Sequence, residues 1–161
     1  MTPSPALAHR APVFPMPEPM RLALAEARVA AEGGEVPVGA VLMLDGRVVA
    51  AAGNAPRAMR DPTAHAEMRV IREGAALLGA ERLGRCDLWV TLEPCAMCAG
   101  AIAHARIRRL YYGASDPKGG GVEHGARVFA RATCHHRPEV YGGLGEREAA
   151  ELLRGFFAER R

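Results

Sequence analysis

No uncharged apolar run in this sequence approaches the roughly 18 to 20 residues that a membrane-spanning helix needs, because Arg, Asp, Glu or His interrupts every candidate. This pattern excludes a helical membrane span. The sequence also lacks the glycine period of collagen, the composition of a coiled coil, the cysteine density of a disulfide scaffold and any internal repeat. The composition is that of an ordinary globular protein, with 49% apolar and 24% charged residues. The length of 161 residues is that of one domain.

The net charge of +3 is too small to demonstrate a polyanionic partner. Its distribution is uneven, because the segment from Arg106 to Arg137 holds seven basic residues against only Asp116 and Glu123. The seven are Arg106, Arg108, Arg109, Lys118, Arg127, Arg131 and Arg137. A polyanion would bind to this segment, but a solvated surface with opposite charges nearby explains the pattern equally well.

The first nineteen residues hold six of the twelve prolines and lack the continuous apolar core of a secretory signal. We expect residues 1–19 to be a Pro-rich tail, disordered or loosely attached, and residues 20–161 to form the domain. The expected location is the reducing cytoplasm. There, cysteines more often bind metals or serve catalysis than form cross-links.

Hydrophobic periodicity predicts alternating helices and strands. A first helix begins at Met20 and ends at Gly33, with Leu22, Ala25 and Val29 on its apolar face. Segments 38–44 and 47–54 flank Asp-Gly, the pair that a two-residue turn prefers, and predict a hairpin.

Asp61 followed by Pro62 predicts an N-cap and a helix from Pro62 to about Leu78, with His65 and Glu67 in its first turns. The remaining predicted elements are a strand over 86–93, a helix over 95–105, a strand from Ile107, a glycine-rich loop, and a helix from Gly145 with Leu152 and Phe156 in its apolar stripe. A strand, a helix and a second strand in this order predict a parallel βαβ unit.

Three potential metal ligands, His65, Cys95 and Cys98, lie at two of the predicted helix starts. Cysteines three apart share a helix face, and a helix N-terminus favours the thiolate form that a metal requires. Sulfur and imidazole ligands suit zinc. Because only three ligands are well placed, the fourth position is open to a water, whose proton Glu67 is placed to accept. His65 and Glu67 are two residues apart, and residues at this spacing point to nearly opposite sides of a regular helix. For both to approach one ion, the ion must lie over the end of the helix.

Each motif alone has an ordinary explanation. A lone Cys-x-x-Cys also fits a redox pair or half of a structural zinc ribbon, and a lone His-Ala-Glu fits a surface helix. The joint pattern favours a catalytic zinc, because each part follows a strand or loop and opens a helix. We interpret Cys86 and Cys134 as incidental, although Cys134 with His135 and His136 is a conceivable second site.

The sequence resembles the bacterial tRNA-specific adenosine deaminases of the zinc-dependent cytidine and deoxycytidylate deaminase superfamily. The resemblance covers roughly residues 20–161. It is carried by EVPVGAV from Glu35, Gly53-Asn54, DPTAHAE from Asp61, TLEPCAMCAGA from Thr91, HRPEVYGG from His136 and LLRGFFAERR from Leu152. The last two segments discriminate, because the zinc motif alone is shared with cytidine, deoxycytidylate and guanine deaminases.

The resemblance implies a three-layer α/β/α cytidine-deaminase-like fold with a central mixed sheet of about five strands flanked by helices. It implies hydrolytic deamination of adenosine to inosine at the wobble position of a tRNA anticodon, in a homodimer with one zinc per subunit. His65, Cys95 and Cys98 would hold the zinc, and Glu67 would move protons to the purine ring and to the leaving ammonia. The residues implied to bind the anticodon arm are Asn54, His104, Arg106, Asp116, Lys118 and Phe156.

Other interpretations stay open. Asn54 also fits a turn-former after a glycine, and Phe156 and Phe157 also fit the core side of a helix. A deaminase of a free base or nucleotide, of guanine, cytosine or cytidine type, would need a pocket closed over a small ligand. A non-catalytic, zinc-stabilised RNA-binding module is disfavoured, because Glu67 is present and no fourth zinc ligand is evident.

Overall fold

A computed structural model describes residues 15–160 of the chain, so the first fourteen residues of the predicted Pro-rich tail lie outside the described residues. Its elements are α1 (Glu18–Glu32), β1 (Gly39–Leu44), β2 (Arg47–Gly53), α2 (Pro56–Met59), α3 (Ala66–Leu78), β3 (Cys86–Leu92), α4 (Ala96–His104), β4 (Arg109–Ala114), the 3₁₀ turn η1 (Val128–Ala130), β5 (Glu139–Tyr141) and α5 (Glu146–Ala158). Within residues 15–160, no helix is long and apolar enough to cross a bilayer.

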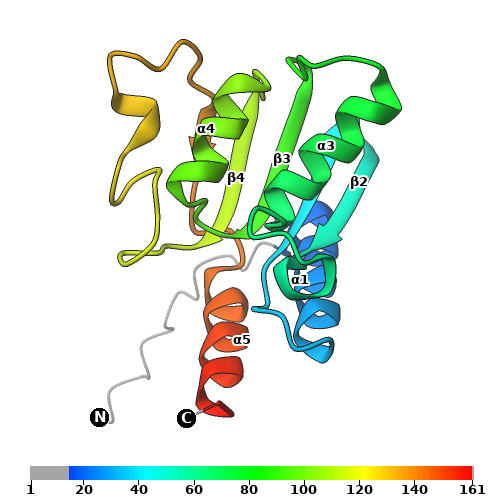
Figure 1. Cartoon of the computed structure of the whole chain (residues 1–161), viewed down its shortest axis with the longest axis vertical. Helices are drawn as coiled ribbons and strands as arrows, with labels where there is room; N and C mark the ends of the chain where they lie inside the picture. The colour runs from blue at the N-terminus through cyan, green and yellow to red at the C-terminus, as the bar shows by residue number, and fades with distance from the viewer. Residues whose placement is uncertain (1–14, 161) are drawn as a thin grey trace, which may run out of the picture.

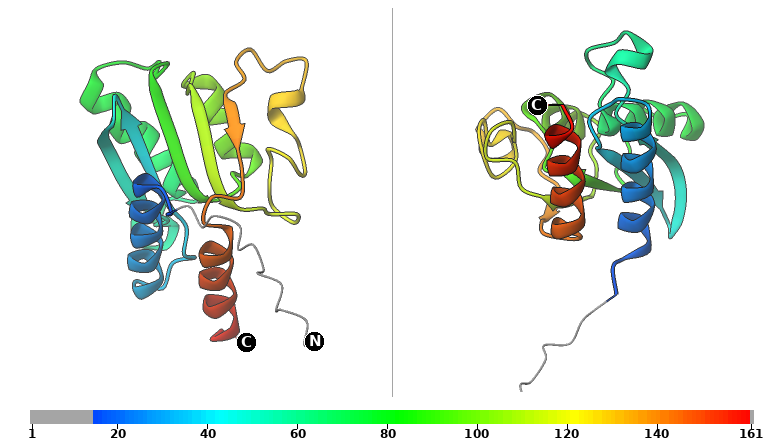
Figure 2. Two further views of the ribbon diagram at one scale, coloured as in Figure 1. Left: turned by 180° about the vertical axis from the view of Figure 1, so that it is seen from behind. Right: turned by 90° about the horizontal axis from the view of Figure 1, so that it is seen from below.

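The elements form three layers, with one sheet of order β2-β1-β3-β4-β5 in the middle. Helices α3 and α4 cover one face of the sheet, and α1 and α5 lie on the other (Figures 1 and 2). β1 pairs antiparallel with both β2 and β3, whereas β3, β4 and β5 run parallel. This arrangement confirms the predicted three-layer architecture and its mixed sheet of five strands.

The predicted hairpin and the predicted βαβ unit are both confirmed. Asp45 and Gly46 join β1 to β2 with φ angles of 50° and 76°, the positive values that a tight hairpin turn requires. α4 connects β3 to β4, which pair in parallel with Leu88 opposite Leu110. β5 was not predicted, because this three-residue edge strand has no buried residue to mark it.

The predicted apolar face of the first helix is wrong. α1 begins at Glu18, and it buries Met20, Ala23 and Leu24 rather than Ala25 and Val29, the latter being 61% exposed. The cause is close packing, since a Cβ on Gly39 would lie 1.9 Å from the carbonyl oxygen of Ala23. At such a separation only an alanine fits directly over Gly39, and Met20 and Leu24 are buried beside it.

The predicted start of the second helix at Pro62 is also wrong, because α3 begins at Ala66. The Asp61 carboxylate accepts hydrogen bonds from the backbone N–H and the hydroxyl of Thr63, at 2.8 and 2.7 Å. Asp61 therefore closes a turn of its own instead of capping a helix. His65 becomes the N-cap residue, with extended backbone angles of φ −69° and ψ 152°.

Candidate metal centre and substrate pocket

The structure brings His65, Cys95 and Cys98 together at one point. His65 and Cys95 are the N-cap residues of α3 and α4, and Cys98 lies in the first turn of α4. His65 Nδ1 is 3.6 Å from Cys95 Sγ and 3.5 Å from Cys98 Sγ. The three ligand atoms all lie within 4.8 Å of one another. Residues 30 positions apart therefore meet where the two helices begin.

These distances fit a tetrahedral zinc. A zinc bound by sulfur at about 2.3 Å and by nitrogen at about 2.0 to 2.1 Å separates the two ligand atoms by about 3.5 Å. His65 and Cys95 are half-buried and Cys98 is buried, so the cluster is accessible from one side. Among the described residues no fourth His, Cys, Asp or Glu completes this group. The donor set is that of an open zinc site.

Hydrogen bonding makes Cys95 the anionic member of the group. Donation from the Cys98 thiol, with a further bond to His65, outweighs burial and lowers the pKa of Cys95 to about 4. The hydrogen bond to Cys95 and burial raise the pKa of Cys98. The bond to Cys95 also raises the pKa of His65. A thiolate beside a thiol and an imidazole is a ready site for a divalent cation.

Glu67 lies in the first turn of α3, two residues after His65, and is only 4% exposed. Burial raises the pKa of its carboxyl. The N-cap backbone of His65 is extended rather than helical, so the two side chains are not forced to opposite sides of a helix. Both His65 and Glu67 line one pocket of about 290 Å³. His65 and Glu67 can therefore both face one site, although they are only two residues apart.

Asn54 and Asp116 line the same pocket. Asn54 follows β2, and its Oδ1 accepts a hydrogen bond of 3.0 Å from the backbone N–H of Ala66, the first residue of α3. Its side-chain NH₂ group has no partner among the described residues. Asp116 lies two residues after the end of β4. The structure therefore places two of the predicted substrate-binding residues in the pocket that His65 and Cys95 line.

Lys118 and Phe156 lie near the pocket, in two neighbouring recesses. Lys118 lines one with Asp116 and Phe157, whose ring is 48% exposed. Phe156 is only 8% exposed and lines the other with Asn54. The guanidinium carbon of Arg160 lies 3.4 Å from the centre of the Phe156 ring. Phe156 is thus both a packing residue and part of the pocket surroundings.

His104 and Arg106 are not brought to the pocket. They lie at the C-terminal end of α4, the end remote from Cys95, and line a separate recess of about 310 Å³. Arg131 and His135 share that recess. The structure therefore divides the predicted RNA-binding residues between two places.

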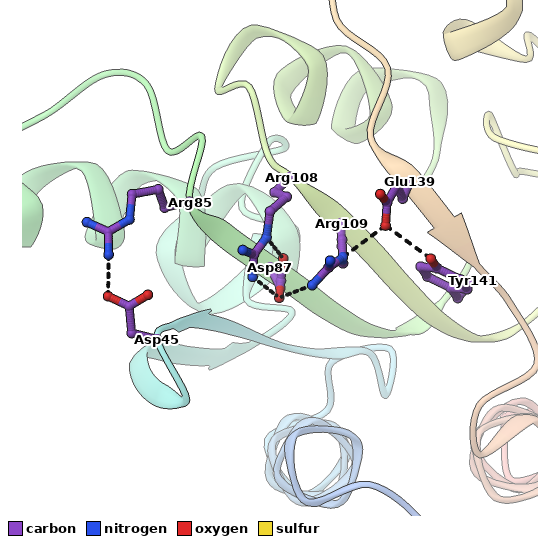
Figure 3. Close-up of polar contacts among 7 residues, drawn as sticks. All are labelled: Asp45, Arg85, Asp87, Arg108, Arg109, Glu139 and Tyr141. Atoms are coloured by element: carbon purple, nitrogen blue, oxygen red, sulfur yellow. Dashed lines mark hydrogen bonds and ion pairs between the residues drawn. The ribbon is translucent and has the colours of Figure 1, made fainter.

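The basic excess between Arg106 and Arg137 is partly neutralised. Arg108 forms two hydrogen bonds to Asp87, at 3.0 and 2.9 Å, and Arg109 pairs with Glu139 at 2.9 Å (Figure 3). These pairs lie at the starts of β3, β4 and β5, whereas Cys95 follows the end of β3. Two of the seven basic residues thus belong to a surface ion-pair network away from the pocket.

Cys134, His135 and His136 do not form a metal group within residues 15–160. The Cys134 thiol donates to the carbonyl oxygen of His136 at 3.1 Å, and a ring nitrogen of His136 bonds the carbonyl oxygen of Ile107 at 2.7 Å. Cys86 is buried in β3. The thiols of Cys86 and Cys134 have ordinary structural environments.

Sequence reasoning missed Glu93 and His124. Glu93 directly follows β3, its side chain is fully buried, and His124 Nδ1 lies 2.7 Å from its carboxylate. Burial alone would raise the pKa of Glu93, but the bonds from His124 and from backbone N–H groups hold that pKa below its usual value. The sequence did hold a signal for Glu93, which lies between a predicted buried strand and a proline. A carboxylate buried there needs hydrogen-bond donors from another part of the chain.

Comparison with known proteins gives a consistent result. The model of the MafB19-like deaminase family matches residues 16–161. A tRNA-specific adenosine deaminase of Agrobacterium fabrum is 64% identical over 142 residues, which cover 88% of this chain and 93% of that protein. A tRNA-specific adenosine deaminase of Bacillus subtilis is 43% identical over 142 residues, covering 88% of each.

The fold of this chain is also similar to a solved one. A structure from a study of A-to-I editing by tRNA:A34 deaminases at the wobble position of transfer RNA matches it with a TM-score of 0.83 at 64% identity. The match covers 84% of this chain and 98% of that chain. It confirms the deaminase fold that the resemblance implied.

Proposed function

This chain belongs to the MafB19-like deaminase family and is related over most of its length to tRNA-specific adenosine deaminases, and on that basis we propose that it converts adenosine to inosine at the wobble position of a tRNA anticodon. The observation that carries the proposal is the convergence of His65, Cys95 and Cys98 beside the buried Glu67, in a pocket that also holds Asn54. The reaction is a hydrolysis, in which water replaces the amino group of the purine.

We propose His65, Cys95 and Cys98 as the ligands of one zinc per chain. Bound there, zinc supplies a Lewis acid that brings the pKa of a water molecule near neutrality. Glu67 accepts a proton from the attacking water and passes it to a ring nitrogen of the purine. The carboxylate, deprotonated again, then takes the proton of the newly added hydroxyl group and delivers it to the amino group. The carbon–nitrogen bond breaks, ammonia leaves and the hydroxyl oxygen becomes the carbonyl oxygen of inosine. Burial of Glu67 keeps bulk water from competing for these protons.

Asn54 is proposed to recognise the base edge. Its Oδ1 is held by the N–H of Ala66, so its NH₂ group is the part that remains to donate to an acceptor on the base. The same bond connects Asn54 to the start of α3, where His65 and Glu67 lie. A base held by Asn54 is therefore positioned relative to both the metal ligands and the proton carrier.

The RNA contacts are proposed in two groups. Asp116, Lys118 and Phe156 surround the pocket and form its rim, where an unstacked nucleotide would enter. His104 and Arg106 lie at the far end of α4 and are proposed to contact the RNA backbone outside the reacting nucleotide.

Binding to an anticodon stem-loop is expected to weaken as salt rises, because each phosphate that a cation neutralises releases counterions. The Lys118→Ala variant should lower the slope of log affinity against log salt by about 1, and raise KM, without changing zinc content. Arg109→Ala is the control, because Arg109 is already paired with Glu139. Salt titrations followed by fluorescence anisotropy measure both slopes. Affinity that does not depend on salt would contradict RNA binding by this surface.

We also propose that the chain forms a homodimer through the outward side of α4. Gly100 lies on that side, and a Cβ added there would meet no atom within 4 Å. A glycine within a helix costs about 1 kcal/mol relative to alanine, and a small residue permits close approach of a second helix. Met97, one turn earlier, is 37% exposed.

The Gly100→Arg variant is expected to be a monomer at micromolar concentration, with its fold intact, while the wild type is a dimer. Gly155→Arg is the matched control, because Gly155 is another helical glycine, in α5, with equally open surroundings. Sedimentation equilibrium measures both. A wild-type monomer, or a dimer of the Gly100→Arg variant, would contradict this interface.

A further inference from the structure

The carboxylate of Glu93 is fully buried and accepts every one of its hydrogen bonds from a single loop. Its Oε1 accepts from the backbone N–H of Asp116 at 3.2 Å and is 2.7 Å from His124 Nδ1. Its Oε2 accepts from three successive backbone N–H groups, those of Val122 (3.4 Å), Glu123 (3.3 Å) and His124 (3.1 Å). Burying a carboxylate costs free energy unless donors satisfy its oxygens, and here the loop supplies these donors. The conformation of the loop and the burial of Glu93 therefore depend on each other.

These donors bracket the segment 116–124, which we name the wall loop. Asp116 lies at its start and Val122, Glu123 and His124 at its end, so a single carboxylate connects both ends. Glu93 itself directly follows β3 and lies two residues before Cys95. Glu93 thereby connects the wall loop to the segment that carries a metal ligand.

Glycines allow the wall loop to close around this carboxylate. A Cβ on Gly120 would lie 2.1 Å from Glu93 Oε2, and a Cβ on Gly121 would lie 2.5 Å from the backbone nitrogen of Ala96. The N–H of Gly121 also donates to the carbonyl oxygen of Pro94 at 2.8 Å. The wall loop therefore lies directly against Glu93 and against the first residue of α4.

The wall loop is one side of the substrate pocket. Asp116 and Gly119 line the pocket that holds His65 and Glu67, and Lys118 lines the adjoining recess. Residues 118–121 donate hydrogen bonds to Asp116 and to the carbonyl oxygen of Pro94, and the carbonyl oxygen of Gly121 accepts one from the N–H of Val128. Glu93 is the buried side chain that connects both ends of the wall loop to the segment before Cys95.

We propose that Glu93 is a positioning residue for this enzyme: its buried carboxylate fixes the wall loop, and with it Asp116 and Lys118, at the distance from the metal centre that a bound nucleotide requires. Glu93 also lines the pocket, but its side chain has no exposed surface and its carboxylate oxygens accept hydrogen bonds from the wall loop. We therefore assign it to holding the loop and not to contact with the reacting atoms. The proposal rests on the proposed function for the identity of the nucleotide. The assignment of the wall loop as its binding surface comes from the pocket geometry.

The Glu93→Gln variant tests the proposal, because glutamine has one acceptor oxygen and its NH₂ group would face backbone N–H donors. KM for an anticodon stem-loop is expected to rise about 10-fold or more, with kcat changed less than about 3-fold and one zinc per chain retained. Trypsin should cleave faster after Lys118 and Arg127, because the loop opens more often. Glu139→Gln is the control, since Glu139 is a 58% exposed glutamate in the ion-pair network of Figure 3. It should change neither KM nor cleavage.

The Gly120→Ala variant gives a second test that leaves Glu93 intact. Its methyl group would lie 2.1 Å from Glu93 Oε2 and 2.5 Å from the carbonyl oxygen of Asp116, and would therefore push the wall loop away from the carboxylate. It should reproduce the rise in KM and the faster cleavage, and it decides the matter if Glu93→Gln does not fold. Unchanged KM and cleavage in the folded variants would overturn the proposal. So would a loss of zinc and kcat at constant KM, which would mean that Glu93 supports Cys95 instead. If the wild type acts on a free base, cleavage and the KM for that base provide the same test independently of RNA.

Discussion

Serine in place of Cys95 is expected to lower kcat/KM by at least about 1,000-fold and to remove most of the bound zinc. The hydrogen bonds that lower the pKa of Cys95 to about 4 make it the thiolate of the group at neutral pH. A serine hydroxyl of nearly the same size does not ionise there and is a poor ligand for zinc. Two remaining protein ligands hold zinc weakly, and the Lewis acid is lost with the metal. Metal analysis by mass spectrometry and steady-state kinetics measure the two effects.

Cys134→Ser is the matched control for this experiment. Cys134 is also half-buried, but its thiol donates to a backbone carbonyl, a role that a serine hydroxyl can fill. The variant should keep one zinc per chain and nearly full activity. If Cys95→Ser retained zinc and turnover, or if Cys134→Ser lost both, the assignment of the metal centre would be wrong.

Glutamine in place of Glu67 is expected to reduce kcat by about 100-fold or more, while zinc content and thermal stability stay near those of the wild type. The amide keeps the size of the side chain but cannot accept a proton from water or carry it to the purine. Because the defect lies in the chemical step, KM for an anticodon stem-loop should change little. Single-turnover measurements of inosine formation separate this step from binding.

Glu73→Gln is the control for Glu67→Gln. Glu73 lies on the same helix, α3, but is exposed to solvent. It should leave kcat unchanged. Turnover near the wild-type rate in Glu67→Gln would remove Glu67 from the mechanism and leave the proton transfers to another group.

The sequence predicted the helices and strands whose signals are local. The Asp45-Gly46 turn and the alternation of strand and helix around Cys95 determine a hairpin and a parallel unit by short-range sterics, and both are present. The two errors have different causes. The helix starts later than predicted because Asp61 accepts hydrogen bonds from Thr63, two residues on, and closes a local turn. The buried face of α1 is set by a tertiary contact, the close approach of the helix to Gly39.

The candidate site divides in the same way. Spacing predicts that Cys95 and Cys98 share one face of a helix, and the joint pattern with His65 predicted that all three meet. The distance of Arg106 from the pocket follows from the helix, because Cys95 precedes α4 and Arg106 follows it. The resemblance, and not the helix, had assigned Arg106 to the substrate. Charge counting also fails where partners come from distant strands, as when Asp87 and Glu139 neutralise Arg108 and Arg109. The role of Glu93 needed the course of a loop that has no periodic pattern.

The central claim is tested most directly by the product. The purified, zinc-loaded protein is incubated with an anticodon stem-loop bearing a wobble adenosine and, in parallel, with free adenosine, guanine and cytidine. Nucleosides and bases are then identified by liquid chromatography and mass spectrometry. The proposed function predicts inosine at the wobble position, with little conversion of the free compounds. Efficient formation of xanthine from guanine or uridine from cytidine, with the stem-loop unchanged, would contradict it.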